Sequence, residues 1–295
     1  MSHEAVGLLA HLWRFPVKSM LGEKLDEALI TPRGLLGDRA YGLIETATGK
    51  VVSAKSVKAY PDMFACRATY VVPPRPGEPL PPVRFTFPDG TSVTSDSDTA
   101  DAALSNFFKR DVKLTPTAPD DFTIDEYHPD IEKDDLGPAI EAKLGSALFA
   151  RVGVPSPVPA GAFFDAFPLS ILTTSTIERL NSLRPQSAFD ERRFRMNVIV
   201  RTNAAGFVEN DWVGKAVAIG NDVRLQITMP DPRCVMTTLA QAELPRDIEV
   251  LRTLTQHNRL PIAGLGKSPC AGVYAVVSAA GALRKGDPVS LHTNE

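Results

Sequence analysis

Cys234 is the residue of this sequence whose surroundings are best suited to chemistry. Apolar and polar residues alternate over 223–229, which predicts a half-buried strand. Because neither proline of Pro230-Asp231-Pro232 can donate to a β ladder, we expect the strand to stop and the chain to bend there. A guanidinium such as that of Arg233 lowers the pKa of a neighbouring thiol and favours the thiolate, which binds metals. The alternative is a buried structural cysteine.

Four other places hold a cation or a small polar side chain on stiff or glycine-rich backbone. Helix N-termini bind phosphate through free N–H groups, and nearby Lys or Arg side chains add charge-assisted hydrogen bonds. If these places converge near Cys234, they form a pocket for an anionic ligand that ends in a thiolate for a soft metal. The alternatives are surface charges, simple helix caps, and an ion pair of Arg195 with Asp190 or Glu191. The residues are Lys18 and Ser19 after a proline, Arg39 after Gly37-Asp38, Thr173-Thr174-Ser175 where a helix should begin, and Arg195 and Asn197 where a strand should begin.

Composition restricts the classes of function. The chain has 295 residues, of which 43% are hydrophobic, and a formal net charge of −3, so we expect no nucleic-acid partner. It lacks a run of about 18 apolar residues, and we therefore expect no membrane span. The N-terminus lacks the pattern of a secretory signal, which favours a cytoplasmic protein. Three widely spaced cysteines argue against a disulfide framework and a zinc site, and we interpret Cys66 and Cys270 as structural.

Short strand patterns between Pro-rich and Gly-rich turns predict a mainly β protein with a few helices, an α+β fold of two barrel-like or sandwich-like units. Helices are predicted from Asp98, from Ser175 with its capping box, and from Arg246. The acidic, proline-bearing segment 115–137 predicts a solvated linker rather than a docking surface. Strands are predicted at residues 6–13, 25–30, 40–45, 50–54, 64–72, 83–87, 91–95, 147–152, 194–200, 216–219, 272–278 and 289–291, with a turn at 281–286.

At these residues the chain resembles a known family. It is similar to MOSC-domain proteins that carry a preceding MOSC N-terminal β domain, the architecture of the mitochondrial amidoxime-reducing component and its bacterial relatives. The resemblance keeps the order of the family's motifs and covers nearly the whole chain. The matching stretches are Phe15-Pro-Val-Lys-Ser19, Gly37-Asp-Arg39, Phe167-Pro-Leu-Ser-Ile-Leu-Thr-Thr174, Arg193-Phe-Arg-Met-Asn197, Asp211-Trp-Val-Gly214, Arg233-Cys-Val-Met-Thr-Thr238 and Gly286-Asp-Pro-Val289.

The resemblance implies a MOSC N-terminal β-barrel domain over residues 1–118 and a MOSC β-barrel domain over residues 119–295. It also implies a molybdenum cofactor, in which a phosphorylated pterin holds molybdenum through a dithiolene. Cys234 falls on the family's metal-ligating cysteine, and Pro232 departs from a serine that some relatives use to contact the cofactor. The implied cofactor-binding residues are Lys18, Ser19 and Arg39 from the first domain, and Thr174, Ser175, Arg195, Asn197 and Arg233 from the second.

The resemblance further implies an oxidoreductase that reduces small N-hydroxylated compounds, such as amidoximes and hydroxylamines, to amines. Some bacterial relatives carry an iron–sulfur domain with four cysteines, which this chain does not match. We therefore expect a separate electron-transfer protein, a b-type cytochrome, a ferredoxin or a flavoprotein. The alternative is a carrier that delivers the cofactor or a persulfide sulfur through Cys234. In cofactor sulfurases a MOSC domain follows a pyridoxal-phosphate desulfurase domain, for which this chain has no room, so we expect independence from pyridoxal phosphate.

Overall fold

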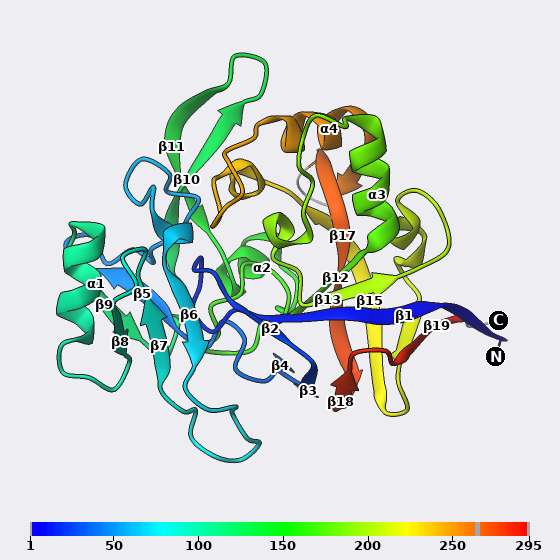
Figure 1. Cartoon of the computed structure of the whole chain (residues 1–295), viewed down its shortest axis with the longest axis horizontal. Coiled ribbons are helices and arrows are strands. Elements are labelled where there is room, and N and C mark those ends of the chain that lie inside the picture. Colours follow the sequence, from blue (N-terminus) through cyan, green and yellow to red (C-terminus); the bar gives the residue numbers. More distant parts are fainter. Residues whose placement is uncertain (1, 263–265, 294–295) are drawn as a thin grey trace.

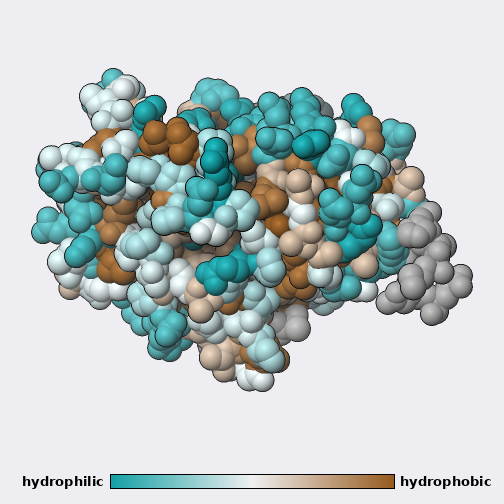
Figure 2. All heavy atoms as spheres, turned by 90° about the horizontal axis from the view of Figure 1, so that it is seen from below, coloured by the Kyte–Doolittle hydropathy of each residue, from teal (hydrophilic) through white to brown (hydrophobic). Residues whose placement is uncertain are grey.

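The computed structural model describes residues 2–262 and 266–293, and it confirms a mainly β fold with a few helices. Figure 1 shows a half built around long strands and a second half built of short strands and helix α1. None of the helices within the described ranges has the length and apolarity that a membrane crossing requires. Apolar residues on the face drawn in Figure 2 form separate patches between hydrophilic ones.

Seven strands close into a barrel in the half with the long strands. The pairing of β12 with β17 joins the two ends of the sheet, so that none of the seven is left as a free edge. The first strand of the chain, β1, lies in this barrel between β13 and β19, two strands that come much later in the sequence. In order around the barrel the strands are β12 (Leu169–Thr173), β13 (Val198–Arg201), β1 (Ser2–Arg14), β19 (Pro288–Thr293), β14 (Ala216–Ile219), β15 (Val223–Pro232) and β17 (Gly266–Ala279).

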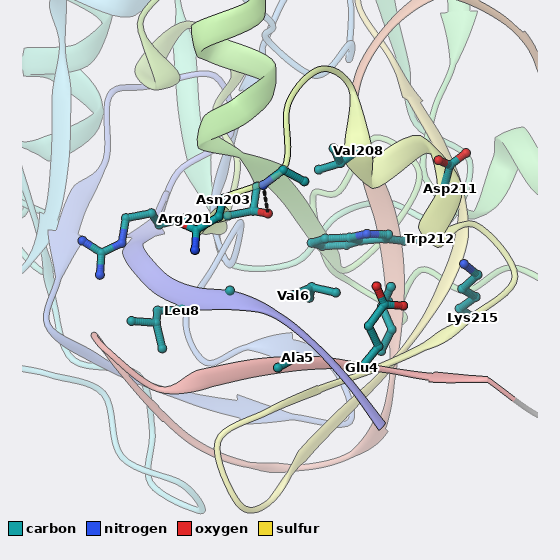
Figure 3. Close-up of a pocket in the computed structure, with 14 residues that line it drawn as sticks. Glu4, Ala5, Val6, Leu8, Arg201, Asn203, Val208, Asp211, Trp212 and Lys215 are labelled. Atoms are coloured by element: carbon teal, nitrogen blue, oxygen red, sulfur yellow. Dashed lines mark hydrogen bonds between the residues drawn. The ribbon is translucent and has the colours of Figure 1, made fainter. Parts of the chain in front are cut away.

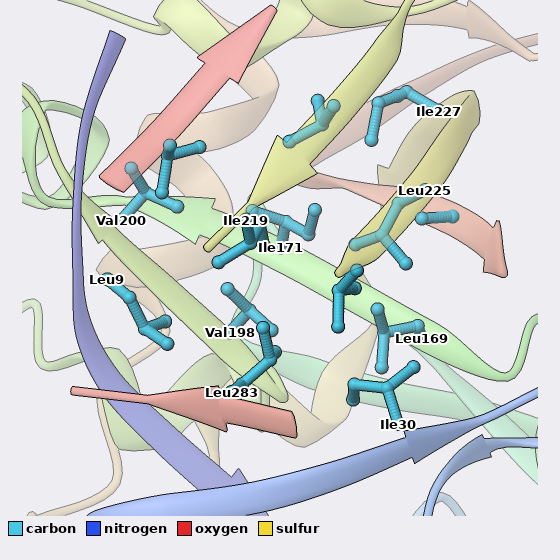
Figure 4. Packing of buried hydrophobic residues seen from close by; sticks show 14 of the residues in the cluster. Leu9, Ile30, Leu169, Ile171, Val198, Val200, Ile219, Leu225, Ile227 and Leu283 are labelled. Atoms are coloured by element: carbon cyan, nitrogen blue, oxygen red, sulfur yellow. The ribbon is translucent and has the colours of Figure 1, made fainter. Parts of the chain in front are cut away.

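Inward-facing aliphatic side chains fill this barrel. Figure 4 shows Leu9, Ile171, Val198 and Leu225 converging from four different strands. Each of these side chains is almost fully removed from water, and burial of one such side chain stabilises the fold by about 1.5–3 kcal/mol. The described residues therefore form a packed core inside the barrel, so a functional site is expected at its ends or outside it.

The other half has a separate core and shorter sheets. Its centre contains Met20, Phe64 and Phe85, and α1 packs on it through Leu104. The elements that precede the acidic segment are β2 (Glu23–Leu25), β3 (Glu27–Thr31), β4 (Gly34–Leu35), β5 (Gly42–Glu45), the 3₁₀ helix η1 (Met63–Ala65), β6 (Arg67–Tyr70), β7 (Val83–Thr86), β8 (Ser92–Thr94), α1 (Ala100–Phe108) and β9 (Val112–Thr115). Of these, β2 pairs with β1, and β3 and β4 pack on the barrel core through Ile30 and Leu35. Strand β18 (Gly281–Arg284), where a turn had been expected, pairs with β3.

The acidic segment predicted to be a linker is instead a β-hairpin. Strands β10 (Thr123–Asp130) and β11 (Asp135–Lys143) pair antiparallel and project from the body in Figure 1. Asp134 at the tip is paired with Arg246, and the Ile131 carbonyl accepts from Arg252. The composition did not predict this hairpin, because its exposed strands carry solvent-facing charges instead of an apolar stripe.

Residues 147–152 were predicted to be a strand, and that prediction is wrong. They belong to helix α2 (Ser146–Val152), which ends at Gly153 in a left-handed conformation, as helices often do. The remaining helices are α3 (Thr174–Leu183) and α4 (Glu249–His257), the 3₁₀ helices are η2 (Glu191–Phe194), η3 (Val208–Trp212) and η4 (Val235–Thr238), and β16 (Arg259–Ile262) pairs with β17.

Strand β15 does not stop before its prolines, contrary to the sequence prediction. Pro230 lies opposite Val273 and Pro232 opposite Cys270 in the ladder with β17, with a register shift between the two prolines. Prolines are tolerated in strands at such irregularities, where an N–H is not needed. The chain bends only after Pro232, which sets Arg233 and Cys234 at the very end of the strand.

Gly272 provides a test of how tightly β12 and β17 are packed. Its φ is +80°, and a Cβ added there would lie 2.5 Å from the carbonyl oxygen of Ile171. We expect Gly272→Ala to lower the free energy of unfolding by about 3 kcal/mol, from backbone strain and overpacking together. Gly286 has φ +93° with open space around it, so Gly286→Ala should cost only about 1 kcal/mol. Denaturant unfolding measures both losses of stability, and equal losses for the two variants would contradict the steric clash at Gly272.

Candidate functional site

Cys234 lies at the N-terminus of η4, where the chain leaves the barrel. It is partly exposed, whereas Cys66 and Cys270 are fully buried. The Cys234 carbonyl accepts a hydrogen bond of 3.0 Å from the Thr237 hydroxyl, which fixes the turn. The Met236 backbone amide is directed at the sulfur and favours its thiolate form. Of the three cysteines, Cys234 alone is open to a reagent or a metal.

The expectation that Arg233 lowers the pKa of Cys234 is wrong in its net direction. Burial raises the pKa of this thiol, and it outweighs the opposing charges of Lys55 and, more weakly, of Arg233. Arg233 is engaged elsewhere, because its guanidinium pairs with the buried Asp231 and donates to the Phe194 carbonyl. The Nε of Arg233 is buried and has no partner among the described residues.

Lys18 is buried rather than on the surface, and it belongs to a three-membered ion network. Its ammonium donates to Asp165 and, at 3.1 Å, to the Phe163 carbonyl. Lys55 approaches the other oxygen of Asp165 at 3.1 Å. Burial opposes ionisation of Asp165, but the two ammonium groups outweigh it and hold the pKa of this carboxyl below its usual range. Asp165 therefore stays charged and keeps both lysines in place.

Arg39 and Arg195 meet at one aromatic ring. The guanidinium carbon of Arg39 lies 4.5 Å from the centre of the Phe15 ring, and that of Arg195 lies 4.3 Å from it. Arg39 pairs with Asp38 and donates at 3.0 Å to the Arg195 carbonyl. Asn197 donates at 3.0 Å to the same Asp38. The sequence predictions that placed these three residues together are thus consistent with the contacts.

Arg195 is a buried cation without a carboxylate partner within the described residues. The alternative pairs do not form, because Asp190 binds Arg192 and Glu191 binds His11. Burial lowers the pKa of Arg195 to about 9, and the charge of Arg39 adds to the shift. An uncompensated buried charge is costly unless a ligand of opposite charge joins it. The site therefore fits an anionic group such as a phosphate.

Backbone strain coincides with the predicted site. Six non-glycine residues of the described ranges have positive φ, and three of them are Ser19, Arg39 and Arg195, with φ of 63°, 46° and 55°. A positive φ costs a non-glycine residue about 1 kcal/mol or more. It persists where the surrounding structure enforces it, often at functional sites. The strain marks the same residues that the sequence had singled out.

No described contact joins Thr174 or Ser175 to the cluster of Lys18, Arg39 and Arg195. Helix α3 is capped by Thr173, whose hydroxyl accepts from the Thr176 amide, so the predicted cap at Ser175 is wrong by two residues. The Ser175 hydroxyl contacts Thr173, which donates to the buried Glu209. The Thr174 hydroxyl is buried and has no hydrogen-bond partner among the described residues, and Thr174 lines a hollow of about 590 Å³ that is also lined by His11 and Trp13.

Another hollow of the described structure holds none of the predicted residues. Figure 3 shows Trp212 between Val6 and Val208, with Glu4 and Lys215 at one end. Its volume is about 700 Å³, and its walls come from β1, β19, η3 and the end of β13 with the loop that follows it. The site around Cys234 is therefore defined by charge, strain and contacts, and not by the size of a hollow.

Sequence reasoning missed Lys55, Asp165 and Asp231. Lys55 occurs in Ser53-Ala-Lys-Ser56, and neither it nor Asp165 belongs to a motif that indicates chemistry. The roles of Lys55 and Asp165 follow only from ion pairs between residues 71 to 147 positions apart. Asp231 alone had a signal, because an acidic residue between two prolines beside an Arg-Cys pair invites an ion pair.

Comparison with known protein families identifies the two domains of this architecture. Residues 6–118 match the MOSC N-terminal beta barrel domain, and residues 159–290 match the MOSC domain. The chain therefore belongs to the MOSC family, in the form that combines these two domains. The segment between the two matches contains the β10–β11 hairpin. Our boundary after residue 118 stays a prediction.

Within this family the chain is homologous to the amidoxime-reducing components over nearly its full length. It is 26% identical to mitochondrial amidoxime-reducing component 1 of Mus musculus, over 98% of this chain and 83% of that protein. The corresponding protein of Homo sapiens is 27% identical, over 98% and 84%. Among solved structures, the YUAD protein from Bacillus subtilis aligns with a TM-score of 0.42 at 11% identity, over 100% of this chain and 98% of that chain.

Asp165→Asn tests the ion network. Because the side chain of Asp165 is 35% exposed, we expect a loss of about 2 kcal/mol in the free energy of unfolding at pH 7, less than for a fully buried pair. A carboxyl with a lowered folded pKa stabilises above its unfolded pKa of about 4 and ceases to do so as the pH falls through the folded value. The difference between the wild type and the variant should therefore be constant from pH 5 to 7 and shrink below pH 4.

Asp121→Asn is the matched control, since Asp121 pairs with Lys143 on the surface. It should change the stability little at any pH. A loss as large as that of Asp165→Asn would contradict the role assigned to the buried network.

Proposed function

We propose that this protein is a molybdenum-cofactor oxidoreductase that reduces N-hydroxylated compounds, such as amidoximes and hydroxylamines, to amines. The observation that supports it most is a partly exposed Cys234 thiol beside buried cations, one of which lacks a counter-charge. The names of the mouse and human relatives, and the MOSC domain itself, support the class of reaction. We further propose that the protein acts in the cytoplasm, although those relatives are mitochondrial by name.

In this proposal the residues of the site divide into three tasks. Cys234 holds the metal as a thiolate. Lys18, Ser19 and Arg39 bind the anionic pterin from the first half, and Arg195, Asn197 and Arg233 bind it from the second. Thr174 and Ser175 complete the set by their place in the family pattern and at the start of α3. The cofactor supplies, when bound, a metal that exchanges two electrons with the substrate.

The chain's own residues contribute binding, orientation and the exclusion of water. Arg195 and the unpartnered Nε of Arg233 are donors that an anionic ligand would satisfy. Asp38 and Asp165 hold Arg39 and Lys18 in position before any ligand arrives, so little reorganisation accompanies binding. Pro232 offers no side-chain hydrogen bond at the place where some relatives have a serine.

The proposed reaction requires an external reductant. The N–O bond of the substrate breaks, two electrons and two protons are taken up, and the products are the amine compound and water. The electrons come from a separate carrier, a b-type cytochrome, a ferredoxin or a flavoprotein. The partial exposure of Cys234 leaves an approach for a small N-hydroxylated substrate.

The partial exposure of Cys234 also favours a second candidate function. A carrier that delivers the cofactor, or a persulfide sulfur held on Cys234, also needs a thiol that another protein can reach. A persulfide carrier differs from the reductase in what the purified protein holds at Cys234, a sulfur atom instead of a metal. Intact-mass and metal analysis distinguish them.

Metal and pterin content test the proposed function. We expect near-stoichiometric molybdenum and pterin in the wild type purified from a host that makes abundant cofactor. Cys234→Ser should lose most of the metal, because a hydroxyl is a poor ligand for a soft metal ion. Cys66→Ala, which alters a cysteine in the core of the first half, should retain it. Neither metal nor pterin in the wild type, with a persulfide on Cys234, would favour the carrier instead.

A further inference from the structure

Lys55 is a buried cation of the first half that the family pattern did not single out. It is 8% exposed and lies in the turn after Val52. Its amide donates to the Ser53 hydroxyl at 3.2 Å, and its carbonyl accepts from the Tyr127 amide at 3.1 Å. The backbone of Lys55 is thus fixed on both sides, by its own turn and by strand β10.

The ammonium of Lys55 is held by two carboxylates from different parts of the chain. Its Nζ lies 3.1 Å from an oxygen of Asp165 and 3.5 Å from an oxygen of Glu126. An ammonium has three donors, and no further hydrogen bond of this Nζ is present within the described residues. One N–H therefore remains for a ligand.

Lys55 lies close to the Cys234 site. Strand β10, which binds Lys55 and supplies Glu126, packs against η4, the turn that begins after Cys234. Asp165 also binds Lys18, which belongs to the proposed cofactor site. Lys55 is moreover the charge that acts most strongly on the Cys234 thiol.

We infer that Lys55 is the substrate-binding residue of this site, donating its third N–H to the oxygen of the N–O group beside Cys234. This inference rests on the proposed function for the identity of the substrate, but not for the placement of Lys55. A cationic donor at that oxygen is stronger than a neutral one, and it stabilises the negative charge that develops as the N–O bond breaks. The alternative role is a purely structural ion pair between the first half and the β10–β11 hairpin.

Lys50 offers a matched control for that structural role. Its Nζ also binds two carboxylates of the same hairpin, Asp125 at 2.7 Å and Glu141 at 2.9 Å, with no described link to Cys234. If Lys55 only holds the hairpin in place, loss of the charge at Lys50 and loss of the charge at Lys55 should have the same effect. If Lys55 also supplies a charge to the Cys234 site, only the Lys55 variants should change that site.

The first measurement needs no cofactor. We would alkylate Cys234 in the full-length, cofactor-free protein with anionic iodoacetate and with neutral iodoacetamide, and confirm the modified residue by peptide mass mapping. Because both reagents react with the thiolate, the ratio of their rates does not depend on the thiolate fraction and reports the local charge. Lys55→Met should lower this ratio roughly threefold to tenfold, since one positive charge near the sulfur is lost. Lys55→Arg should retain most of it, and Lys50→Met all of it.

The second measurement uses the loaded enzyme, with benzamidoxime as substrate and a reduced viologen as electron donor. Lys55→Met and Lys55→Gln should keep the molybdenum content of the wild type and lose roughly tenfold or more in kcat/KM. Lys50→Met should keep both. An unchanged alkylation ratio, or an unchanged kcat/KM in a Lys55 variant that has lost its charge selectivity, would overturn the inference. Absence of molybdenum from the wild type would instead defeat the proposed function, and the alkylation ratio would still decide where Lys55 lies.

Discussion

Asp38 and Asp165 offset the electrostatic cost of burying three cations of the first half, Arg39, Lys18 and Lys55. Asp38 binds Arg39 and Asn197, and it also accepts from the Phe15 amide at 2.6 Å. Asp165 binds Lys18 and Lys55. Without these carboxylates the cations would repel one another or leave for solvent, since buried charges persist only when they are paired. The arrangement is nevertheless incomplete, because Arg195 has no carboxylate of its own within the described structure.

The barrel makes this arrangement possible by fixing the positions of distant residues. Strand β1 pairs with β13 and β19, and its end leads directly into the Phe15 to Ser19 stretch. Strand β13 begins just after Asn197, and β15 ends just before Arg233. Three strands of one closed sheet thus deliver Lys18, Arg195 and Cys234 from positions far apart in sequence. A closed barrel has little freedom to deform, which keeps such a site in shape before a ligand binds.

The β10–β11 hairpin gives the site its outer wall. It supplies Glu126 to Lys55, packs on η4, and is tied at its tip to Arg246 and Arg252 near α4. It is the part of the chain between the two family matches that contacts both Lys55 and the turn after Cys234.

The sequence by itself determined the mainly β class and the family, and it singled out Cys234, because these depend on local periodicity and on motifs of adjacent residues. It also selected Arg39, Arg195 and Asn197, which the structure brings together around Asp38 and Phe15, while their role in a site stays a prediction. It failed for the β10–β11 hairpin and helix α2, where exposed charges and a short apolar run do not distinguish the alternatives. Only the tertiary structure decided that β15 continues through its prolines, that burial outweighs Arg233 at the Cys234 thiol, and that Lys55 and Asp165 belong to the site. These outcomes depend on desolvation and on pairing across long sequence separations, and neither is encoded in the order of neighbouring residues.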